Sequence, residues 1–349
     1  MSHNYHHPVR IGDIEVPGNL FLAPVAGYSD AAFRSVCVDE GADLCYTEMV
    51  SAEALTRGHT KTKGLLERAA NEKLYAIQLF GSSPSVLAEA ARLCLPYKPL
   101  LIDLNCGCPV PKIIKAGSGS ALPRDGRRFG EVVEAMAKAL AGSGVPLTVK
   151  FRLGWDQASI NYLETGRIAR EAGAAAVTLH ARTRAQNYSG KADWSAIAAL
   201  VQALPIPVFG SGDIFSAGAA RAFMEGTGAA GVMVARGAMG NPFIFREARA
   251  SLAGLALPPV TVEDRVATAR RHLGLSAGFL GERTACVEFR KQFCSYTKGS
   301  TAGAALRSEA VRASTIAEFE ALFARWLEAS EGRPPERHEP DSPETVFYE

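Results

Sequence analysis

The sequence lacks the features by which membrane and secreted proteins are recognised. No apolar run approaches the roughly 18 residues that cross a bilayer, and the N-terminus has no apolar signal core. The seven cysteines are odd in number and scattered along 349 residues, which does not fit a disulfide framework. We therefore expect a cytoplasmic protein with reduced cysteines and without a membrane partner.

The chain also has little excess charge of either sign. The net charge is +2, but residues 331–349 hold six acidic and two basic residues, so that residues 1–330 carry +6. This mild excess is compatible with a polyanionic partner and does not by itself indicate one. The remaining composition, 47% apolar and 21% charged, is that of a globular protein. The length leaves room for a barrel of roughly 250 residues and a smaller domain.

Short apolar strands alternate with helical segments over the first 254 residues. Eight strands, mostly followed by a helix, predict a parallel sheet covered by helices, and their number favours a closed (β/α)₈ TIM barrel over an open sheet. The segment between Glu48 and Tyr75 has the least clear pattern. The expected strands are Leu20–Val25, Leu44–Glu48, Tyr75–Phe80, Leu100–Asn105, Leu147–Arg152, Ala176–His180, Val208–Ser211 and Gly231–Ala235, and the expected helices are Ala31–Glu40, Val86–Leu95, Phe129–Ala141, Tyr162–Ala172, Trp194–Ala203, Ala217–Gly226 and Pro242–Leu252.

Polar or conformationally special residues follow every one of these strands. In a barrel of this type, the reactive residues lie where the strands end and the loops begin. One such residue would be unremarkable, but eight occupied strand ends predict a site. The residues are Pro24, Val25 and Ala26; Glu48 and Met49; Gln78; Asn105 to Cys108; Lys150 and Arg152; His180 and Arg182; Ser211, Gly212 and Asp213; and Ala235, Arg236 and Gly237.

The last two strand ends are rich in glycine. At these two strand ends, barrels of this type bind phosphate through backbone N–H groups and a helix N-terminus. The residues there are Ser211-Gly212-Asp213 and Ala235-Arg236. Arg236 can add charge at the phosphate oxygens. Tight turns without a ligand explain either loop alone equally well, but the two loops together favour phosphate binding.

The Cys106-Gly107-Cys108 segment permits three interpretations. A zinc site needs four ligands, and no second close pair of cysteines or histidines follows, so we expect no metal. A disulfide within Cys-Gly-Cys would be strained. Cys106 alone is best explained as a small buried residue.

Several of these segments form a recognisable series. Asn105-x-Gly107-Cys108-Pro109 is followed by a second motif, Gly117-x-Gly119-Ser120-x-Leu122, and together they resemble the signature of the tRNA-dihydrouridine synthases. These flavoenzymes reduce selected uridines in the D-loop of tRNA. The flanking segments Leu22–Asp30, Lys150-x-Arg152-x-Gly154-Trp155 and His180-x-Arg182-Thr183 also resemble family motifs. The sequence from His180 to Arg184 is most like that of the bacterial B-type branch. This resemblance makes the uridine at position 17 of the D-loop the first candidate for the target.

The resemblance implies a cofactor, FMN, and a co-substrate, NADPH, that reduces it. It implies that the Pro24–Ala26 backbone and His180 contact the flavin, and that Arg182 faces the flavin phosphate or the RNA. Lys150 would stabilise negative charge on reduced flavin, and Gln78 would hydrogen-bond the ring edge. A histidine or lysine at a strand end also has ordinary structural explanations, as a hydrogen-bonding residue or a solvated charge.

The implied reaction adds hydride from FMN to C6 of a uracil, while Cys108 gives a proton to C5. A thiol suits this role, because its intrinsic pKa of about 8.5 leaves it mostly protonated at neutral pH. Asn105 would orient the uracil edge, and Arg152 would contact the substrate. Two alternatives remain: a barrel reductase of a small pyrimidine or enone, and a regulator that binds RNA and keeps flavin without catalysis.

Beyond residue 254 the pattern changes to helix alone. Leu257-Pro258-Pro259 predicts a linker, and Thr261–Asp264 and Thr315–Glu318 have the form of capping boxes. We expect a barrel domain over 1–254, a helical domain over 255–332, and a disordered tail over 333–349. The resemblance implies that the helical domain binds tRNA, with Arg290 and Lys291 among its cations, and a monomer suffices.

Overall fold

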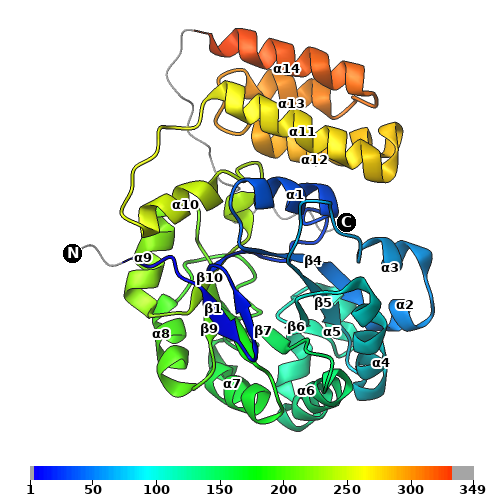
Figure 1. Ribbon diagram of the computed structural model, residues 1–349, viewed down its shortest axis with the longest axis vertical. Coiled ribbons are helices and arrows are strands. Elements are labelled where there is room, and N and C mark those ends of the chain that lie inside the picture. Colours follow the sequence, from blue (N-terminus) through cyan, green and yellow to red (C-terminus); the bar gives the residue numbers. More distant parts are fainter. Residues whose placement is uncertain (1–3, 332–349) are drawn as a thin grey trace.

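A computed structural model describes residues 4–331, and its largest part is a closed barrel of eight parallel strands (Figure 1). The strands pair in the order β10-β3-β4-β5-β6-β7-β8-β9, which closes the sheet on itself. The predicted TIM barrel is therefore confirmed. The strands are β3 (Leu20–Leu22), β4 (Leu44–Ser51), β5 (Tyr75–Phe80), β6 (Leu101–Cys106), β7 (Leu147–Arg152), β8 (Ala176–His180), β9 (Val208–Ser211) and β10 (Gly231–Val234).

Helices surround the barrel and bury the outward faces of the strands. The segment between Glu48 and Tyr75, whose pattern was unclear, holds two helices of five residues, too short to show an amphipathic period. The surrounding helices are α1 (Ala31–Asp39), α2 (Ala52–Thr56), α3 (Thr60–Gly64), α4 (Pro84–Cys94), α5 (Pro111–Lys115), α6 (Gly126–Leu140), α7 (Tyr162–Glu171), α8 (Trp194–Ala203), α9 (Ala217–Thr227) and α10 (Ile244–Leu252), with 3₁₀ turns η1 (Leu95–Tyr97), η2 (Gly119–Arg124), η3 (Gln157–Ser159) and η4 (Arg236–Ala238).

An antiparallel hairpin that the sequence did not reveal precedes the barrel. Its strands β1 (Val9–Ile11) and β2 (Ile14–Val16) have three residues each, too few to show an alternating pattern. Val9, Ile11 and Val16 are buried against the first inward-facing residues of the barrel strands, such as Phe21. The hairpin therefore closes the end of the barrel opposite the predicted site.

Strict alternation along the strands separates two environments. On β6, Ile102 and Leu104 pack into the outer core under the helices, whereas Leu101 points into the barrel with the hairpin residues. Because successive side chains of a strand point to opposite faces, Asp103 and Asn105 share the inward face with Leu101. The barrel interior is thus apolar at one end and polar at the other.

Four helices form a bundle beside the barrel (Figure 1). They are α11 (Val262–Leu280), α12 (Glu282–Tyr296), α13 (Gly303–Ala310) and α14 (Ile316–Ser330). Both predicted capping boxes are confirmed, since Thr261 and Thr315 exchange hydrogen bonds with Asp264 and Glu318. A separate apolar cluster fills the bundle. The tail predicted to be disordered lies outside the described residues.

The bundle docks on the barrel through α1 and α11. The ring of Phe33 on α1 stacks on that of His272 on α11, with centroids 5.5 Å apart. In the segment that follows β10, a Cβ atom on Gly240 would lie 2.2 Å from the carbonyl carbon of Ser295. The barrel backbone and α12 are therefore in direct contact there. The bundle therefore sits next to the carboxyl ends of the strands.

Candidate active site

The inward side chains at the carboxyl ends of the strands lie in register. The strand pairing places Asn105 beside Lys150, and His180 between Arg152 and Ser211. These residues line one cavity. Its lining contains most of the residues predicted to hold the cofactor, namely Pro24, Val25, Ala26, Gln78, Lys150, His180, Ser211, Ala235 and Arg236, together with Asn105, Cys108 and Arg152.

Lys150 supplies positive charge to this cavity. Burial and the neighbouring Arg152 lower the pKa of its ammonium group to about 8. A lysine in this state gains from an anionic neighbour, because negative charge nearby stabilises its charged form. The site is therefore prepared for a ligand that carries or develops negative charge.

A smaller hollow continues from this cavity toward the loops after β9 and β10. Ser211, Gly212, Asp213, Ala235 and Arg236, all predicted to bind phosphate, line it. The two loops pack closely: a Cβ atom on Gly237 would lie 2.0 Å from the carbonyl oxygen of Ile214.

His180 borders both hollows. Its Nε2 atom is buried and has no hydrogen-bond partner among the residues of the described part. Burial and the surrounding arginines and lysine hold the pKa of the imidazole well below its usual value, so the ring is neutral. An unpaired buried nitrogen at this position is explained by a ligand that supplies its partner.

The carboxylate of Asp213 borders the phosphate hollow and is also bound by Arg182. Arg182 Nη2 donates to both carboxylate oxygens, at 2.8 and 2.9 Å, and Arg182 Nε donates to the carbonyl oxygen of Ser189. Arg182 is 1% exposed. The structure thus uses Arg182 to fix the loop that carries Asp213, which leaves its predicted contact with phosphate or RNA a prediction.

A chain of buried hydrogen bonds places the Cys108 loop. The Asn105 Oδ1 atom accepts from the backbone N–H groups of Gly107 and Cys108, at 3.1 and 2.9 Å. Asn105 Nδ2 donates to Gln78 Oε1 at 2.7 Å, and Gln78 Nε2 donates to Asp103 Oδ2 at 2.7 Å. Much of the hydrogen-bonding capacity of Asn105 is therefore used to hold the loop, and its contact with uracil remains a prediction.

Asp103 belongs to this hydrogen-bonded chain, although the sequence did not single it out. It is fully buried inside the barrel, accepts a 2.6 Å hydrogen bond from Thr148, and burial raises its pKa to about 6. Its position two residues before Asn105 on a strand was the available signal, because it places both side chains on one face. Asp103 anchors the chain that ends at the Cys108 loop.

Cys108 keeps its proton in this environment. Burial raises the pKa of its thiol, and only part of this effect is offset by the Val110 amide, Arg152 and Lys150. The glycine-rich motif supports the same loop: Ser120 N–H donates to the Cys108 carbonyl oxygen at 3.0 Å, and Gly119, at φ +59°, leaves no room for a Cβ atom, which would lie 2.7 Å from that oxygen. Cys106 packs into the outer core, as its interpretation as a small buried residue predicted.

The predicted substrate cations lie in different settings. Arg152 donates to the carbonyl oxygens of Gly107 and Thr183, at 2.8 and 3.0 Å, so it braces the Cys108 loop from behind. Arg290 donates to the carbonyl oxygen of Ala313 within the bundle. Lys291 reaches the barrel instead, since its Nζ atom lies 6.0 Å from the centre of the Tyr28 ring.

Residues 4–331 contain no group of three or more His, Cys, Asp or Glu side chains arranged to hold a metal ion. No helix within that range is both long and apolar enough to cross a bilayer.

Comparison with known proteins finds relatives that match most of this chain. A probable tRNA-dihydrouridine synthase of Treponema pallidum (strain Nichols) is 49% identical over 329 residues, which are 92% of this chain and 97% of that protein. The tRNA-dihydrouridine synthase B of Pseudomonas aeruginosa is 37% identical over 275 residues, 78% of this chain and 82% of that protein.

Solved structures that are more distant in sequence share the barrel fold. Morphinone reductase superposes with a TM-score of 0.51 at 14% identity, over 76% of this chain and 93% of that one. 2-Naphthoyl-CoA reductase gives a TM-score of 0.55 at 14% identity over 70% of this chain, which spans only 52% of that longer protein. The family model described as Dihydrouridine synthase (Dus) matches residues 21–330, and the chain therefore belongs to the dihydrouridine synthase family.

Proposed function

We propose that this protein reduces specific D-loop uridines of tRNA to 5,6-dihydrouridine, with FMN as its bound cofactor and NADPH as the reductant. The single observation that carries the proposal is the placement of a protonated thiol, Cys108, and a partly buried cation, Lys150, in the lining of one cavity. The relatives named tRNA-dihydrouridine synthase support the same reaction.

The residues present fit FMN. Two closely packed loops after β9 and β10 line a hollow suited to a phosphate, and the unpaired Nε2 atom of His180 lies between that hollow and the main cavity. When bound there, FMN would supply the hydride that adds to C6 of the uracil. Lys150 would stabilise the negative charge that reduction places on the ring, and Gln78 and the Pro24–Ala26 backbone would position it.

Cys108 completes the addition by donating its proton to C5. Its raised pKa keeps the thiol protonated at neutral pH, which a general acid requires. The hydrogen bonds from the Gly107 and Cys108 amides to Asn105 fix the direction of this thiol. Arg152 acts on the same loop from the opposite side.

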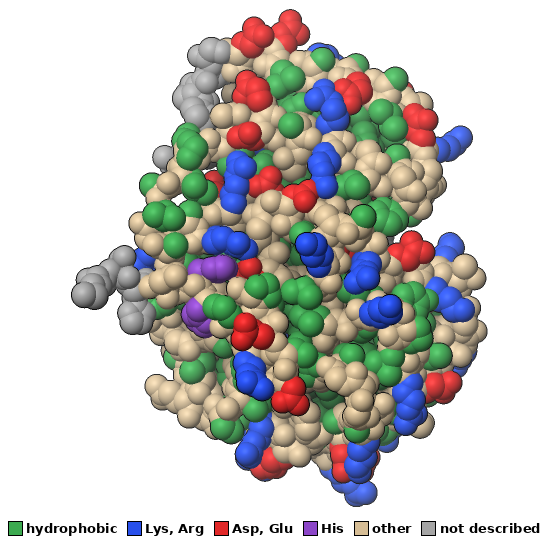
Figure 2. Space-filling model, in the orientation of Figure 1, with side chains coloured by type: hydrophobic (Ala, Val, Ile, Leu, Met, Phe, Trp, Pro, Cys, Tyr) green, Lys and Arg blue, Asp and Glu red, His purple; other side chains and the backbone are tan. Residues whose placement is uncertain are grey.

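The substrate assignment rests on the bundle as well as on the relatives. Lys and Arg side chains occur over both the bundle and the barrel on the face shown in Figure 2, with acidic residues between them. Lys291 lies where the bundle meets the first barrel loop, near Tyr28. A polyanion that contacts the bundle could reach the cavity from there, whereas a free pyrimidine would need no such domain. From the resemblance of the His180–Arg184 segment to the bacterial B-type branch, we propose position 17 as the target.

We further propose that residues 1–254 and 255–332 act as catalytic and tRNA-binding domains of a monomer, without metal, in the cytoplasm. The separate apolar clusters of barrel and bundle support the division. The proposed substrate and reductant support the location.

The deciding experiment maps dihydrouridine by mass spectrometry in tRNA incubated with purified protein, FMN and NADPH. We expect dihydrouridine at position 17 with the wild-type protein and its loss or strong slowing with Cys108→Ala. A wild-type protein that oxidises NADPH but leaves every uridine intact would refute the tRNA substrate. A free uracil or an enone tested in parallel would then identify a small-molecule reductase.

A further inference from the structure

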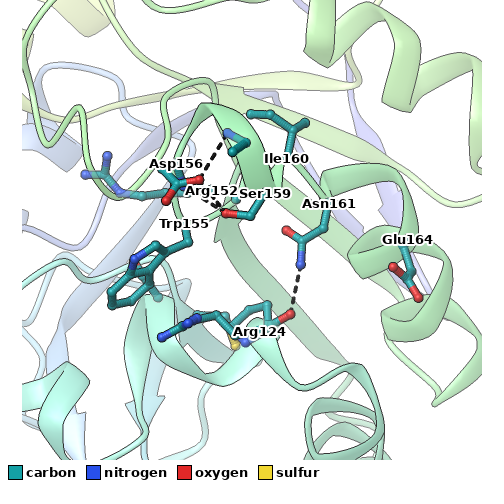
Figure 3. Close-up of a pocket in the computed structure, with 13 residues that line it drawn as sticks. Arg124, Arg152, Trp155, Asp156, Ser159, Ile160, Asn161 and Glu164 are labelled. Atoms are coloured by element: carbon teal, nitrogen blue, oxygen red, sulfur yellow. Dashed lines mark hydrogen bonds between the residues drawn. The ribbon is translucent and has the colours of Figure 1, made fainter.

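A second cavity lies next to the proposed active site rather than within it. It has a volume of about 600 Å³, in the usual range of ligand sites, and its lining includes Cys106, Ser120, Arg124, Trp155 and Asn161. Arg152 also lines the Cys108 cavity, so the two cavities are neighbours. Nothing in the proposed reaction uses this second cavity (Figure 3).

One wall of this cavity is a stack of arginine on tryptophan. The guanidinium carbon of Arg124 lies 4.4 Å from the centre of the Trp155 ring. Arg184, which does not line the cavity, packs on the same ring, with its guanidinium carbon 4.5 Å from the centre. The backbone holds Trp155 in place, because Ala185 N–H donates to its carbonyl oxygen at 2.8 Å. Planar guanidinium and indole groups of this kind are surfaces on which nucleobases stack.

Polar groups on the other walls are suited to hydrogen bonding with a ligand. The Ser120 hydroxyl is buried and has no hydrogen-bond partner in the described part of the chain. Asn161 Nδ2 donates to the Pro123 carbonyl oxygen at 2.9 Å, which fixes its carboxamide at the edge of the cavity and leaves its oxygen as an acceptor (Figure 3). Ser120 thus shows the unmet hydrogen-bonding capacity that a ligand would satisfy.

Two carboxylates also line the cavity. Asp156 is occupied by the turn that it caps, since it accepts from Ala158 N–H and from the Ser159 hydroxyl. Glu164 lies at the far side from Trp155 in Figure 3. Glu164 is therefore separated from the arginine side of the cavity.

We propose that this cavity binds a nucleoside phosphate while the target uridine occupies the Cys108 cavity. The base stacks on the layer formed by Arg124 and Trp155, Ser120 and Asn161 hydrogen-bond its edge or sugar, and the guanidinium groups hold the phosphate. The inference rests on the proposed function. Two reactants contain a nucleoside phosphate that fits this description: tRNA, through a nucleotide neighbouring the target uridine, and NADPH, through its adenylate part.

Anaerobic stopped-flow measurements on the flavin-loaded protein separate the two sources. Reduction of the flavin by NADPH and oxidation of the reduced flavin by tRNA are followed in wild type, Trp155→Ala, Arg124→Ala and Asn161→Ala. If tRNA supplies the nucleotide, we expect the half-saturating tRNA concentration to rise about fivefold or more, because stacking of one base is worth roughly 1–3 kcal/mol. Reduction by NADPH then stays unchanged. If NADPH supplies it, the half-saturating NADPH concentration rises instead.

The control is Arg127→Ala, which removes an exposed arginine paired with Glu131 outside the cavity. Arg124→Lys keeps the charge but loses the planar stack, so it should behave like Arg124→Ala. If Trp155→Ala fails to fold, the Arg124 and Asn161 variants carry the test. Half-saturating concentrations within twofold of wild type for both reactants in these variants would overturn the proposal.

A second readout is independent of turnover. Calorimetric titration of the protein with AMP and with UMP should show binding that Arg124→Ala abolishes and Arg127→Ala preserves. Absence of binding by either nucleotide to the wild-type protein, together with unchanged half-reactions, overturns the cavity assignment. Failure of the wild-type protein to form dihydrouridine while AMP or UMP still binds would instead refute the proposed function alone.

Discussion

The carboxamide oxygen of Asn105 accepts a 2.9 Å hydrogen bond from the backbone N–H of Cys108. The residue at the end of β6 thereby fixes the loop that carries the proposed acid. Gln78, on the neighbouring strand, and Asp103, on the same strand, hold Asn105 in turn. The rigid barrel thus determines where the thiol lies, because each member of this chain points inward from a strand.

Asn105→Ala should slow the step in which reduced flavin is oxidised by tRNA. Loss of the acceptor frees the Gly107 and Cys108 amides, so the thiol is no longer held toward the substrate. General acid catalysis contributes about 10²–10⁴-fold, and we expect a loss of roughly 10- to 100-fold when the acid is present but misplaced. Reduction of the flavin by NADPH in the same variant is the internal control. Equal slowing of both half-reactions would show that Asn105 acts on the flavin instead.

The pH dependence of tRNA reduction should identify Cys108 as the acid. Only the protonated thiol can donate, so the rate falls as pH rises through its folded pKa. Because burial raises that pKa above its ordinary value, the rate at saturating tRNA should begin to fall only at a higher pH than for a thiol in water. Cys108→Ala should remove the decline at higher pH along with most of the rate. A decline centred near pH 7 would contradict the thiol as donor.

Much of the barrel could be predicted from the sequence, because its eight strands are apolar runs bounded by polar residues. The hairpin β1–β2 could not, since three-residue strands carry no period. The sequence predicted the polar residues at the strand ends, but it did not predict which residues they contact. Nothing in the sequence shows that Arg182 is bound to Asp213 or that Arg152 braces Gly107, because both contacts join segments distant in the chain. The cavity beside Trp155 likewise exists only once η2 and the loop after β7 meet.

Lys150→Met should have opposite effects on the stability of the flavin-free and flavin-loaded protein. The folded pKa of Lys150, about 8, lies below its ordinary value of 10.5, so the charged lysine destabilises the flavin-free fold below pH 8. This penalty disappears as pH rises from 8 to 10.5. At about 1.36 kcal/mol per pKa unit, we expect the flavin-free variant to gain about 3 kcal/mol at pH 7.

Urea unfolding of both proteins with and without FMN measures this effect. With FMN bound, the loss of a stabilising charge should make the variant less stable than wild type. A flavin-free variant that is no more stable than wild type at pH 7 would contradict the lowered pKa.

Gly119→Ala should disturb the Cys108 loop as well as the fold. Gly119 combines a φ of +59° with a position at which a Cβ atom would lie 2.7 Å from the Cys108 carbonyl oxygen. Gly142, at φ +76°, has open space around its Cβ position and provides a matched control for backbone strain alone. We expect Gly142→Ala to cost about 1 kcal/mol and Gly119→Ala about 2–4 kcal/mol, with a loss of tRNA reduction in the second only. Equal effects of the two substitutions on thermal unfolding and turnover would contradict the close approach.

His272 should make the contact between bundle and barrel sensitive to acid. The imidazole is fully buried, stacks on Phe33, meets the edge of Phe289 and lies 3.3 Å from the Tyr296 hydroxyl. Burial lowers its pKa to about 4, an effect that Arg271 reinforces and Asp30 opposes. Above pH 6.5 the ring is neutral in both the folded and the unfolded protein and has no effect on their balance. As pH falls from 6.5 toward 4, the unfolded chain takes up the proton first, and the fold loses about 3 kcal/mol.

His272→Phe removes this titration while keeping an aromatic ring between the two parts. Its free energy of unfolding, measured with urea, should therefore decline less than that of wild type between pH 6.5 and 4. The exposed His59 on the barrel gives the matched control, because His59→Ala should follow the wild-type curve. Parallel curves for His272→Phe and wild type would mean that the imidazole is protonated in the folded protein. The stack on Phe33 would then have to hold a charged ring, which its burial disfavours.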